Sequence, residues 1–310
     1  MDTEFEWDFD AWIGKERQMR LTTTCTLVAC VVLSVAVITL GWAGDAKPRL
    51  ANPLFAFDNG TGRDSQVPFS KQAKMLKQLG YAGIGFTGTA RIQEMLKALD
   101  AHGLKMFSIY VSANIAADRP AYDKAGLSKA IEQLNGGDTL IWLCVEGAVP
   151  TSDEADDRAV AIIREIGDMA EKSGLRVALY HHVRHYVDQV EDAVRLVKQV
   201  DRKNVGASFN LCHFLKLDDE KYLQQRLEES MPHLFVVSIN GADSGETKSM
   251  DWDRLIQRLD QGSFDMKGLL QTLDELGYTG PIGLQSYNVA GDVPDNLRSS
   301  IEAWRKLSVQ

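Results

Sequence analysis

The sequence has few of the residues on which several classes of protein depend. Its 310 residues include four cysteines, too few for a disulfide framework, and Cys144 and Cys212 are expected to be buried as small apolar side chains. There is no low-complexity tract, and 45% of the residues are hydrophobic, so a disordered chain is excluded. The net charge is −9, without the basic patch that binding to nucleic acid requires. We therefore expect a globular protein with no nucleic-acid partner.

One long apolar run is present, near the N-terminus. It reads LTTTCTLVACVVLSVAVITLGWA over residues 21–43, follows Lys15, Arg17 and Arg20, and ends in small residues. Such a segment is typical of an export signal or of a single membrane anchor. A start at Met19 would give a shorter and less acidic leader than the first methionine.

This run divides the chain into two parts. We expect residues 1–46 to be the signal peptide or transmembrane anchor and residues 47–310 to form the folded domain. The protein is then exported, either to the periplasm or held in the inner membrane through its N-terminal segment. The sequence leaves cleavage of the signal, the start codon and the oligomeric state open.

From residue 53 onward, short apolar runs alternate with longer amphipathic ones. Because an amphipathic helix follows each predicted strand, the strands are expected to be parallel, and eight such units close into a single (β/α)8 TIM barrel. A doubly wound open sheet is the main alternative, but its first strand would lead into a Gly-rich phosphate loop, which DNGTGRD at residues 58–64 matches poorly. The predicted strands are 53–58, 82–86, 104–112, 138–147, 174–182, 204–210, 233–240 and 281–287.

Polar residues recur at the ends of these strands. In a TIM barrel, chemistry takes place at the C-terminal strand ends, and side chains alternate between the interior and the helix layer. On the sixth predicted strand, Gly206, Ser208 and Asn210 share the small, polar face, which should be the inner one. The same reasoning predicts a functional pocket whose rim collects Glu146, Tyr180, His182, Asn210, Asn240 and Gln285, with His213 in the following loop and Asp58 after the first strand.

Four of these strand ends resemble those of a known family. VALYHH (177–182), ASFNLCH (207–213), VVSINGAD (236–243) and GPIGLQ (280–285) resemble the xylose-isomerase-like TIM barrels, a superfamily of sugar isomerases and epimerases with relatives that act on apurinic DNA and on inosose. The resemblance covers residues 53–307. It implies that Glu, Asp with a following His, His, and Glu at these strand ends bind one divalent metal.

This sequence departs from the metal-binding pattern at each of its three carboxylates and at one of its two histidines. The implied positions hold Tyr180, Asn210, Asn240 and Gln285, and only His213 of the Asp-x-x-His pair is kept. Hard divalent cations need charged oxygens, so we expect no cofactor. A softer ion could still bind weakly through His182 and His213 with amide oxygens and water. Amides both donate and accept hydrogen bonds, which suits a neutral polyol better than a metal cage.

Two functions are compatible with this rim. The first is an isomerase or epimerase, or a related lyase, of a neutral or keto sugar that removes a proton beside a carbonyl. Glu146 or His182 would be the base, and His213 would polarise or protonate the oxygen. Substrate-binding roles would fall to Tyr180, Asn210, Asn240, Gln285 and Tyr287. The second is a non-catalytic carbohydrate-binding barrel that has lost its metal site. The discriminating feature is whether Glu146, His182 and His213 converge.

Overall fold

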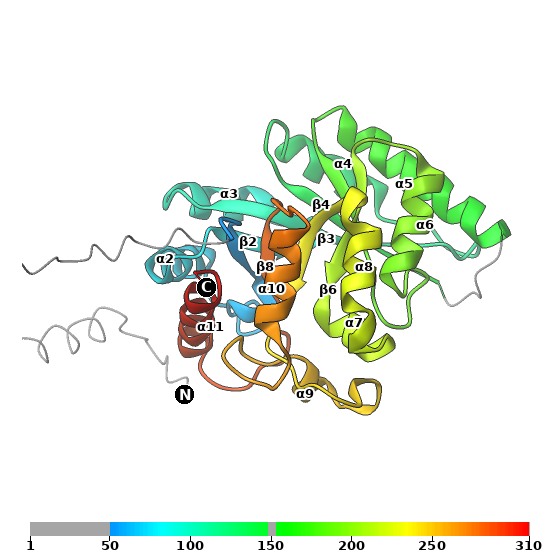
Figure 1. The fold of residues 1–310 in the computed structure, drawn as a ribbon. Helices are drawn as coiled ribbons and strands as arrows, with labels where there is room; N and C mark the ends of the chain where they lie inside the picture. Colours follow the sequence, from blue (N-terminus) through cyan, green and yellow to red (C-terminus); the bar gives the residue numbers. More distant parts are fainter. Residues whose placement is uncertain (1–49, 148–152, 310) are drawn as a thin grey trace, which may run out of the picture. The chain divides into compact units, whose positions relative to one another are not determined.

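A computed structural model describes residues 50–147 and 153–309, and within them it contains a closed barrel of parallel strands in the order β1 to β8 (Figure 1). Each strand pairs with its neighbours along the chain, and β1 pairs with β8 to close the barrel. The predicted single (β/α)8 barrel is therefore confirmed. The strands are β1 (Leu54–Phe57), β2 (Gly83–Thr87), β3 (Lys105–Asn114), β4 (Leu140–Glu146), β5 (Arg176–Tyr180), β6 (Val205–Asn210), β7 (Leu234–Ile239) and β8 (Ile282–Leu284).

Helices return the chain from the end of one strand to the start of the next and cover the outside of the barrel. Helix α2 ends at Gly80, whose φ of 94° lies in the left-handed region that glycine adopts without a Cβ penalty. The helices are α2 (Phe69–Leu79), α3 (Ile92–Asp100), α4 (Lys124–Gln133), α5 (Asp153–Glu171), α6 (Val190–Val200), α7 (Leu211–Leu217), α8 (Leu223–Ser230), α9 (Trp252–Leu255), α10 (Met266–Glu275) and α11 (Val293–Leu307).

One short helix was not expected from the sequence. Helix α7 begins at Leu211, directly after β6, so His213 lies in its first turn and not in a loop. The Asn210 side chain caps this helix by accepting a hydrogen bond from the His213 backbone N–H at 3.4 Å. An Asn at the N-cap stabilises a helix start, which explains why helical structure begins without a connecting loop.

Aromatic side chains fill the barrel interior. Phe57 stacks on Trp142 with ring centroids 4.6 Å apart, and Trp142 stacks on Tyr180 at 4.0 Å. Glycines make room for this stack, because a Cβ at Gly85 or at Gly283 would lie 2.5 Å from the Phe57 ring. The interior is thus closed by a floor of stacked rings, and a second apolar core lies between the strands and the outer helices.

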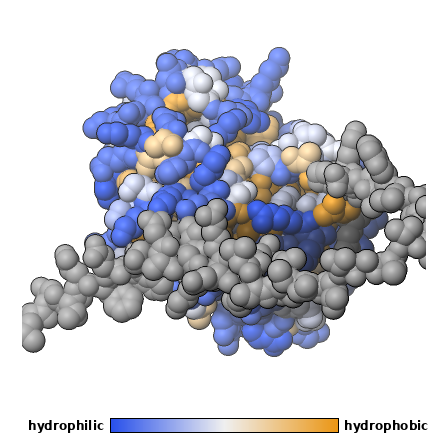
Figure 2. Space-filling view, turned by 90° about the vertical axis from the view of Figure 1, so that its left-hand side faces the viewer, coloured by the Kyte–Doolittle hydropathy of each residue, from blue (hydrophilic) through white to orange (hydrophobic). Residues whose placement is uncertain are grey.

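Hydrophilic residues cover most of the described surface on the face shown in Figure 2. Across residues 50–147 and 153–309, the exposed large hydrophobic side chains are those of Tyr222, Trp252, Tyr287 and Val309. No helix among these residues is long and apolar enough to span a bilayer. The predicted signal or anchor at residues 1–46 lies outside the described residues, so it remains a prediction, as does export.

Candidate functional site

A cavity of about 470 Å³ lies at the C-terminal ends of the strands. This is the end of a TIM barrel at which active sites are built, and the volume falls in the range of small-molecule sites. Trp142 and Tyr180 of the aromatic floor line it, and Trp252 and Tyr287 stand at its edge with 39% and 48% of their surface exposed. Exposed aromatic faces at a cavity edge are suited to stacking on a ring-shaped ligand.

The cavity brings together six of the nine residues that the sequence singled out for the site. Its lining includes Asp58, Tyr180, His182, His213, Gln285 and Tyr287. The other three, Glu146, Asn210 and Asn240, are absent from this lining.

Two imidazoles lie side by side after β5 and β6. The ring centroids of His182 and His213 are 4.1 Å apart. Nδ1 of His182 is 2.9 Å from the Val183 carbonyl oxygen, which can only accept, so Nδ1 carries the proton and Nε2 keeps its lone pair. Burial lowers the pKa of His182 below its ordinary value, and the nearby His185 lowers it further. His182 is therefore a neutral imidazole whose Nε2 can accept a proton.

Tyr180 lies at the centre of a buried hydrogen-bond network. Its hydroxyl oxygen is 2.8 Å from Nε2 of His213 and accepts a hydrogen bond from Nδ2 of Asn210 at 3.2 Å. Burial raises the pKa of Tyr180 well above its ordinary value, so the phenol is protonated. Asn210 is fully buried and touches the cavity only through Tyr180 and the start of α7.

Asn240 is also fully buried, at the end of β7. Its Nδ2 donates to the carbonyl oxygens of Gly241 at 2.8 Å and Leu255 at 2.6 Å, which ties β7 to helix α9. The alternation of side chains along the strand predicted that Asn240 points inward. Its contacts instead hold helix α9, which carries Trp252, and Asn240 is not part of the cavity lining.

Glu146 does not converge fully with the two histidines. It lines a separate, more open cavity with Asn114, Arg119, Arg184 and His185. Its carboxylate is close enough to His182 to favour the protonated imidazole, although burial outweighs this effect on the pKa of His182. The structure thus brings His182 and His213 together and leaves Glu146 on the flank of His182.

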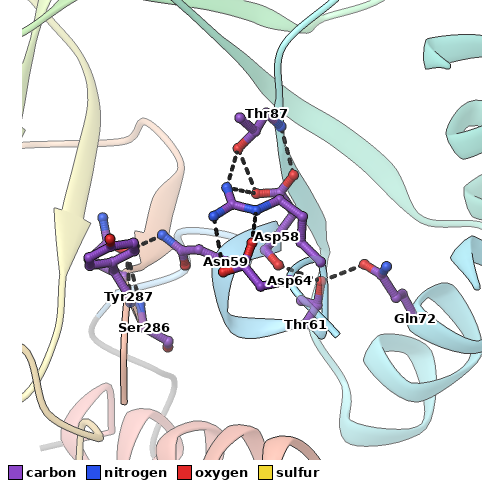
Figure 3. A network of polar contacts seen from close by, with 10 residues as sticks. Asp58, Asn59, Thr61, Asp64, Gln72, Thr87, Ser286 and Tyr287 are labelled. Atoms are coloured by element: carbon purple, nitrogen blue, oxygen red, sulfur yellow. Dashed lines mark hydrogen bonds and ion pairs between the residues drawn. The ribbon is translucent and has the colours of Figure 1, made fainter. Parts of the chain in front are cut away.

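The opposite side of the cavity carries a charged network (Figure 3). Asp58, which follows β1 and is 2% exposed, accepts hydrogen bonds from the Thr87 backbone at 2.8 Å, the Thr87 hydroxyl at 2.7 Å and Arg63 at 3.2 Å. Burial raises the pKa of Asp58, against the opposing effect of its bonds from Thr87 and the charge of Arg63. The sequence pointed to Asp58 but gave no signal for its partners Arg63 and Thr87.

Gln285 joins this network through its side-chain oxygen. Oε1 accepts hydrogen bonds from Asn59 Nδ2 at 2.5 Å, from the Ser286 N–H at 3.0 Å and from the Tyr287 N–H at 3.1 Å. No partner for Nε2 occurs within the described part of the chain, so this donor is available to a ligand in the cavity.

Two further cations line the cavity and were not identified from the sequence. Arg184 follows His182 and Val183, and Lys216 lies on α7 one turn after His213. Nζ of Lys216 donates to the Met250 carbonyl at 2.6 Å and lies 5.7 Å from the centre of the Trp252 ring. A helical spacing of three from His213 was the signal that could have indicated Lys216.

The positions at which the resemblance implies a metal do not fit a hard divalent cation. Oε1 of Gln285 accepts three hydrogen bonds, and Oδ1 of Asn210 accepts from the His213 N–H and from the Cys212 thiol. Their lone pairs are therefore taken, and neither atom carries charge. Residues 50–147 and 153–309 also contain no group of three or more His, Cys, Asp or Glu side chains arranged to hold a metal.

Comparisons with known proteins give sugar-related relatives. Inosose dehydratase from Geobacillus thermodenitrificans (strain NG80-2) is 20% identical over 274 residues, covering 80% of this chain and 87% of that protein. The 3-dehydroshikimate dehydratase of Pseudomonas aeruginosa is 26% identical over 179 residues, 55% of this chain but 27% of that longer protein.

Solved structures share the fold at low identity. The 3-keto-D-glucoside 4-epimerase YcjR from E. coli superimposes with a TM-score of 0.64 at 17% identity, covering 82% of this chain and 99% of that chain. A xylose isomerase-like TIM barrel protein from Mycobacterium smegmatis in complex with magnesium gives a TM-score of 0.61 at 20% identity, covering 83% of this chain and 97% of that chain. The family model described as xylose isomerase-like TIM barrel matches residues 73–307, and this chain belongs to that family.

Proposed function

We propose that this protein is an enzyme that acts on a sugar, or on a related polyhydroxy ketone, by removing a proton from the carbon beside a carbonyl. The observation that carries this proposal is the His182 imidazole, neutral and with a free Nε2 lone pair, at the surface of the cavity. A positioned base of this kind contributes about 10² to 10⁴ in rate.

In the proposed step, the C–H bond breaks and its proton passes to Nε2 of His182. The electron pair of that bond forms a carbon–carbon double bond, and the carbonyl π pair moves onto oxygen, which gives an enolate. Addition of a proton from solvent to the opposite face, with the imidazolium releasing its own proton to solvent, gives an epimer. Loss of a hydroxyl from the next carbon, protonated by the imidazolium as it leaves, gives water and an unsaturated ketone.

The names of the relatives support this class of reaction. Two of them are dehydratases, of inosose and of 3-dehydroshikimate, and YcjR is an epimerase at the carbon next to the keto group of a 3-keto-D-glucoside. Both outcomes follow from one enolate, so the proposal names the shared first step and not the final product.

The remaining lining suits a polyhydroxy substrate. Trp252 and Tyr287 offer ring faces, and Nε2 of Gln285 offers a donor to a hydroxyl or carbonyl oxygen. Asp58, held by Thr87 and Arg63, offers carboxylate lone pairs to hydroxyl groups on the other side. Hydroxyls both donate and accept, so a cavity with both kinds of group can bind them.

The test is deuterium exchange beside the carbonyl, followed by NMR in D2O with a panel of keto sugars and keto cyclitols. We expect exchange with the unmodified protein and a loss of at least about 10² in its rate with His182→Asn. His233→Asn is the matched control, because it removes an imidazole from the residue before β7, at the opposite end of the barrel. Binding of a panel member without exchange would favour the alternative, a carbohydrate-binding barrel without catalysis.

A further inference from the structure

We propose that the Tyr180 hydroxyl donates a hydrogen bond to the substrate's carbonyl oxygen and stabilises the enolate that forms there. This inference rests on the proposed function and identifies the group that would stabilise the negative charge on the substrate oxygen while His182 removes the proton. It places a neutral donor at the strand end where the resemblance implies a metal-binding carboxylate.

The proton on His213 determines where the Tyr180 proton is. The Val183 backbone N–H donates to Nδ1 of His213 at 3.5 Å, so Nδ1 presents a lone pair. Burial and the three neighbouring imidazoles hold the pKa of His213 well below its ordinary value, so the ring is neutral. A neutral imidazole with a bare Nδ1 carries its proton on Nε2. Nε2 therefore donates to the Tyr180 oxygen, 2.8 Å away.

Asn210 supplies a second donor to the same oxygen. Its Oδ1 accepts from the His213 backbone N–H, which fixes the orientation of the amide and turns Nδ2 toward Tyr180 at 3.2 Å. With both lone pairs of the hydroxyl oxygen occupied, the O–H of Tyr180 has no remaining acceptor in residues 50–147 or 153–309. Since Tyr180 lines the cavity, its hydrogen is left for a ligand.

The donor is held rigidly. The Tyr180 ring stacks on Trp142 at 4.0 Å, and the indole N–H of Trp142 donates to the Ser208 hydroxyl at 2.9 Å. A hydroxyl that accepts two hydrogen bonds is polarised into a stronger donor. Fixed donors aimed at the oxygen that gains charge stabilise a transition state without reorganisation.

The proposed base and the proposed donor are adjacent, and the backbone of one residue, Val183, fixes the position of the proton on both histidines. The Tyr180 and His182 ring centroids are 5.5 Å apart, which leaves a carbonyl oxygen and its neighbouring C–H bond within reach of the two side chains. The Val183 carbonyl accepts from His182 and the Val183 N–H donates to His213. One backbone residue thus leaves a lone pair on His182 and, through His213, a hydrogen on Tyr180.

The first experiment does not depend on any substrate. NMR of the protein labelled with ¹⁵N-histidine distinguishes the two neutral tautomers, and the signals are assigned by their loss in His182→Asn and His213→Gln. We expect Nε2–H for His213 and Nδ1–H for His182. A Nδ1–H tautomer of His213 would overturn the inference, because a bare Nε2 would then hold the Tyr180 hydrogen.

The second experiment measures the role itself. With a substrate that exchanges, Tyr180→Phe should lower kcat by about 10² to 10³ and leave KM within a few-fold, as expected for a donor that acts mainly in the transition state. Tyr278→Phe is the matched control, because it removes a buried hydroxyl that donates to the Pro281 carbonyl, remote from the cavity.

Where Tyr180→Phe fails to fold, judged by circular dichroism, replacement by 3-fluorotyrosine keeps the shape and makes the hydroxyl a stronger acid. An altered kcat with an unaltered KM would then support the role, and an unaltered kcat in either variant would overturn it. Absence of exchange in the unmodified protein is a different result: it rejects the proposed function and the enolate role together, even where the tautomers are as expected.

Discussion

The two sides of the cavity differ in how their polar groups are used. On the β1 and β2 side, Asp58 is bonded to Arg63 and Thr87, a charged network with its lone pairs largely engaged. On the β5 and β6 side, His182 keeps a lone pair and Tyr180 keeps a hydrogen, and neither side chain is charged. A carboxylate fixed by three hydrogen bonds can orient a substrate hydroxyl with the lone pair that remains, whereas an imidazole lone pair and a phenol hydrogen without partners can take part in proton transfer. Under the proposed function, the first side therefore binds the substrate and the second side transfers the proton.

The largest effect should come from pH. Proton transfer needs neutral His182, whose pKa lies below the ordinary histidine value of about 6.5 because of burial and His185, against the smaller raising effect of Glu146. Turnover should be flat from pH 7 to 8 and should fall about tenfold per pH unit once the pH passes below that pKa. The measurement is the pH profile of exchange, and a midpoint at pH 7 or above would contradict the assignment of His182.

Acid also affects the fold, so circular dichroism must accompany each point of this profile. Burial lowers the pKa of His181 to about 3, and burial together with the neighbouring imidazoles holds the pKa of His213 well below its ordinary value. Both are protonated more readily in the unfolded chain, so their contribution to stability is complete above about pH 6.5 and declines as the pH falls toward the folded-state pKa. Loss of exchange in a still-folded protein isolates the effect of His182.

The next effect is on the charged side. Asp58→Asn keeps the shape of the side chain but removes the charge that Arg63 meets and one of the acceptors of Thr87. We expect a loss of about 1–3 kcal/mol in the free energy of unfolding, since hydrogen bonds to a buried charge contribute on that order. Chemical denaturation measures this. Asp64→Asn is the control, because Asp64 also pairs with Arg63 but is exposed. A 10²-fold loss of exchange with unchanged stability in Asp58→Asn would reverse the division of roles.

A smaller effect is expected for Asn210, which caps helix α7 and donates a hydrogen bond to Tyr180. Asn210→Ala removes the cap of α7, which should cost about 1 kcal/mol, and removes one of the two donors to Tyr180. Asp292→Ala removes a cap of the same kind from α11 and should cost a similar amount without altering kcat. Equal kcat values in the two variants would show that Asn210 acts as a cap alone.

The smallest effect is expected for Glu146→Gln. Because Glu146 lines the flanking cavity, the change should lower turnover at neutral pH by less than about tenfold, well below the effect expected of a base. It should also move the acid limb of the pH profile to lower pH, since Glu146 favours protonated His182. A loss of 10² or more at neutral pH, with the limb in place, would make Glu146 the base.

The sequence predicted the barrel and several of the residues that line its cavity, for identifiable reasons. The series of short apolar runs identified the strands, and the alternation of side chains along each strand placed Tyr180 and His182 on the inner face, where the structure has them. This alternation predicts the direction of a side chain but not whether its polar group already has a hydrogen-bond partner. Asn210 and Asn240 do lie at the C-terminal ends of their strands. However, Asn210 forms the cap of a helix, and Asn240 donates to backbone carbonyl oxygens.

The residues that were missed depend on contacts between distant segments. Arg63, in the loop after β1, and Thr87, at the end of β2, both donate hydrogen bonds to Asp58. No local sequence pattern predicts contacts between segments this far apart. Lys216 was not identified because the start of α7 at Leu211 was not expected. Only within that helix does its spacing of three from His213 place the two residues on the same face. The family resemblance pointed to the correct strand ends, while the hydrogen bonds at those ends decide what each residue can do.

The packing of the floor gives two glycines a share in positioning the Tyr180 hydroxyl, the proposed donor. Phe57 lies between Gly85 and Gly283, where an added methyl carbon would meet its ring at 2.5 Å, and the same ring supports Trp142 and, through it, Tyr180. Neither glycine has a side chain to offer a substrate. Gly85→Ala or Gly283→Ala would nevertheless tilt the stack and shift the phenol at its end. The constraint on the proposed donor therefore extends through the thickness of the barrel, and residues that bear no functional group are part of it.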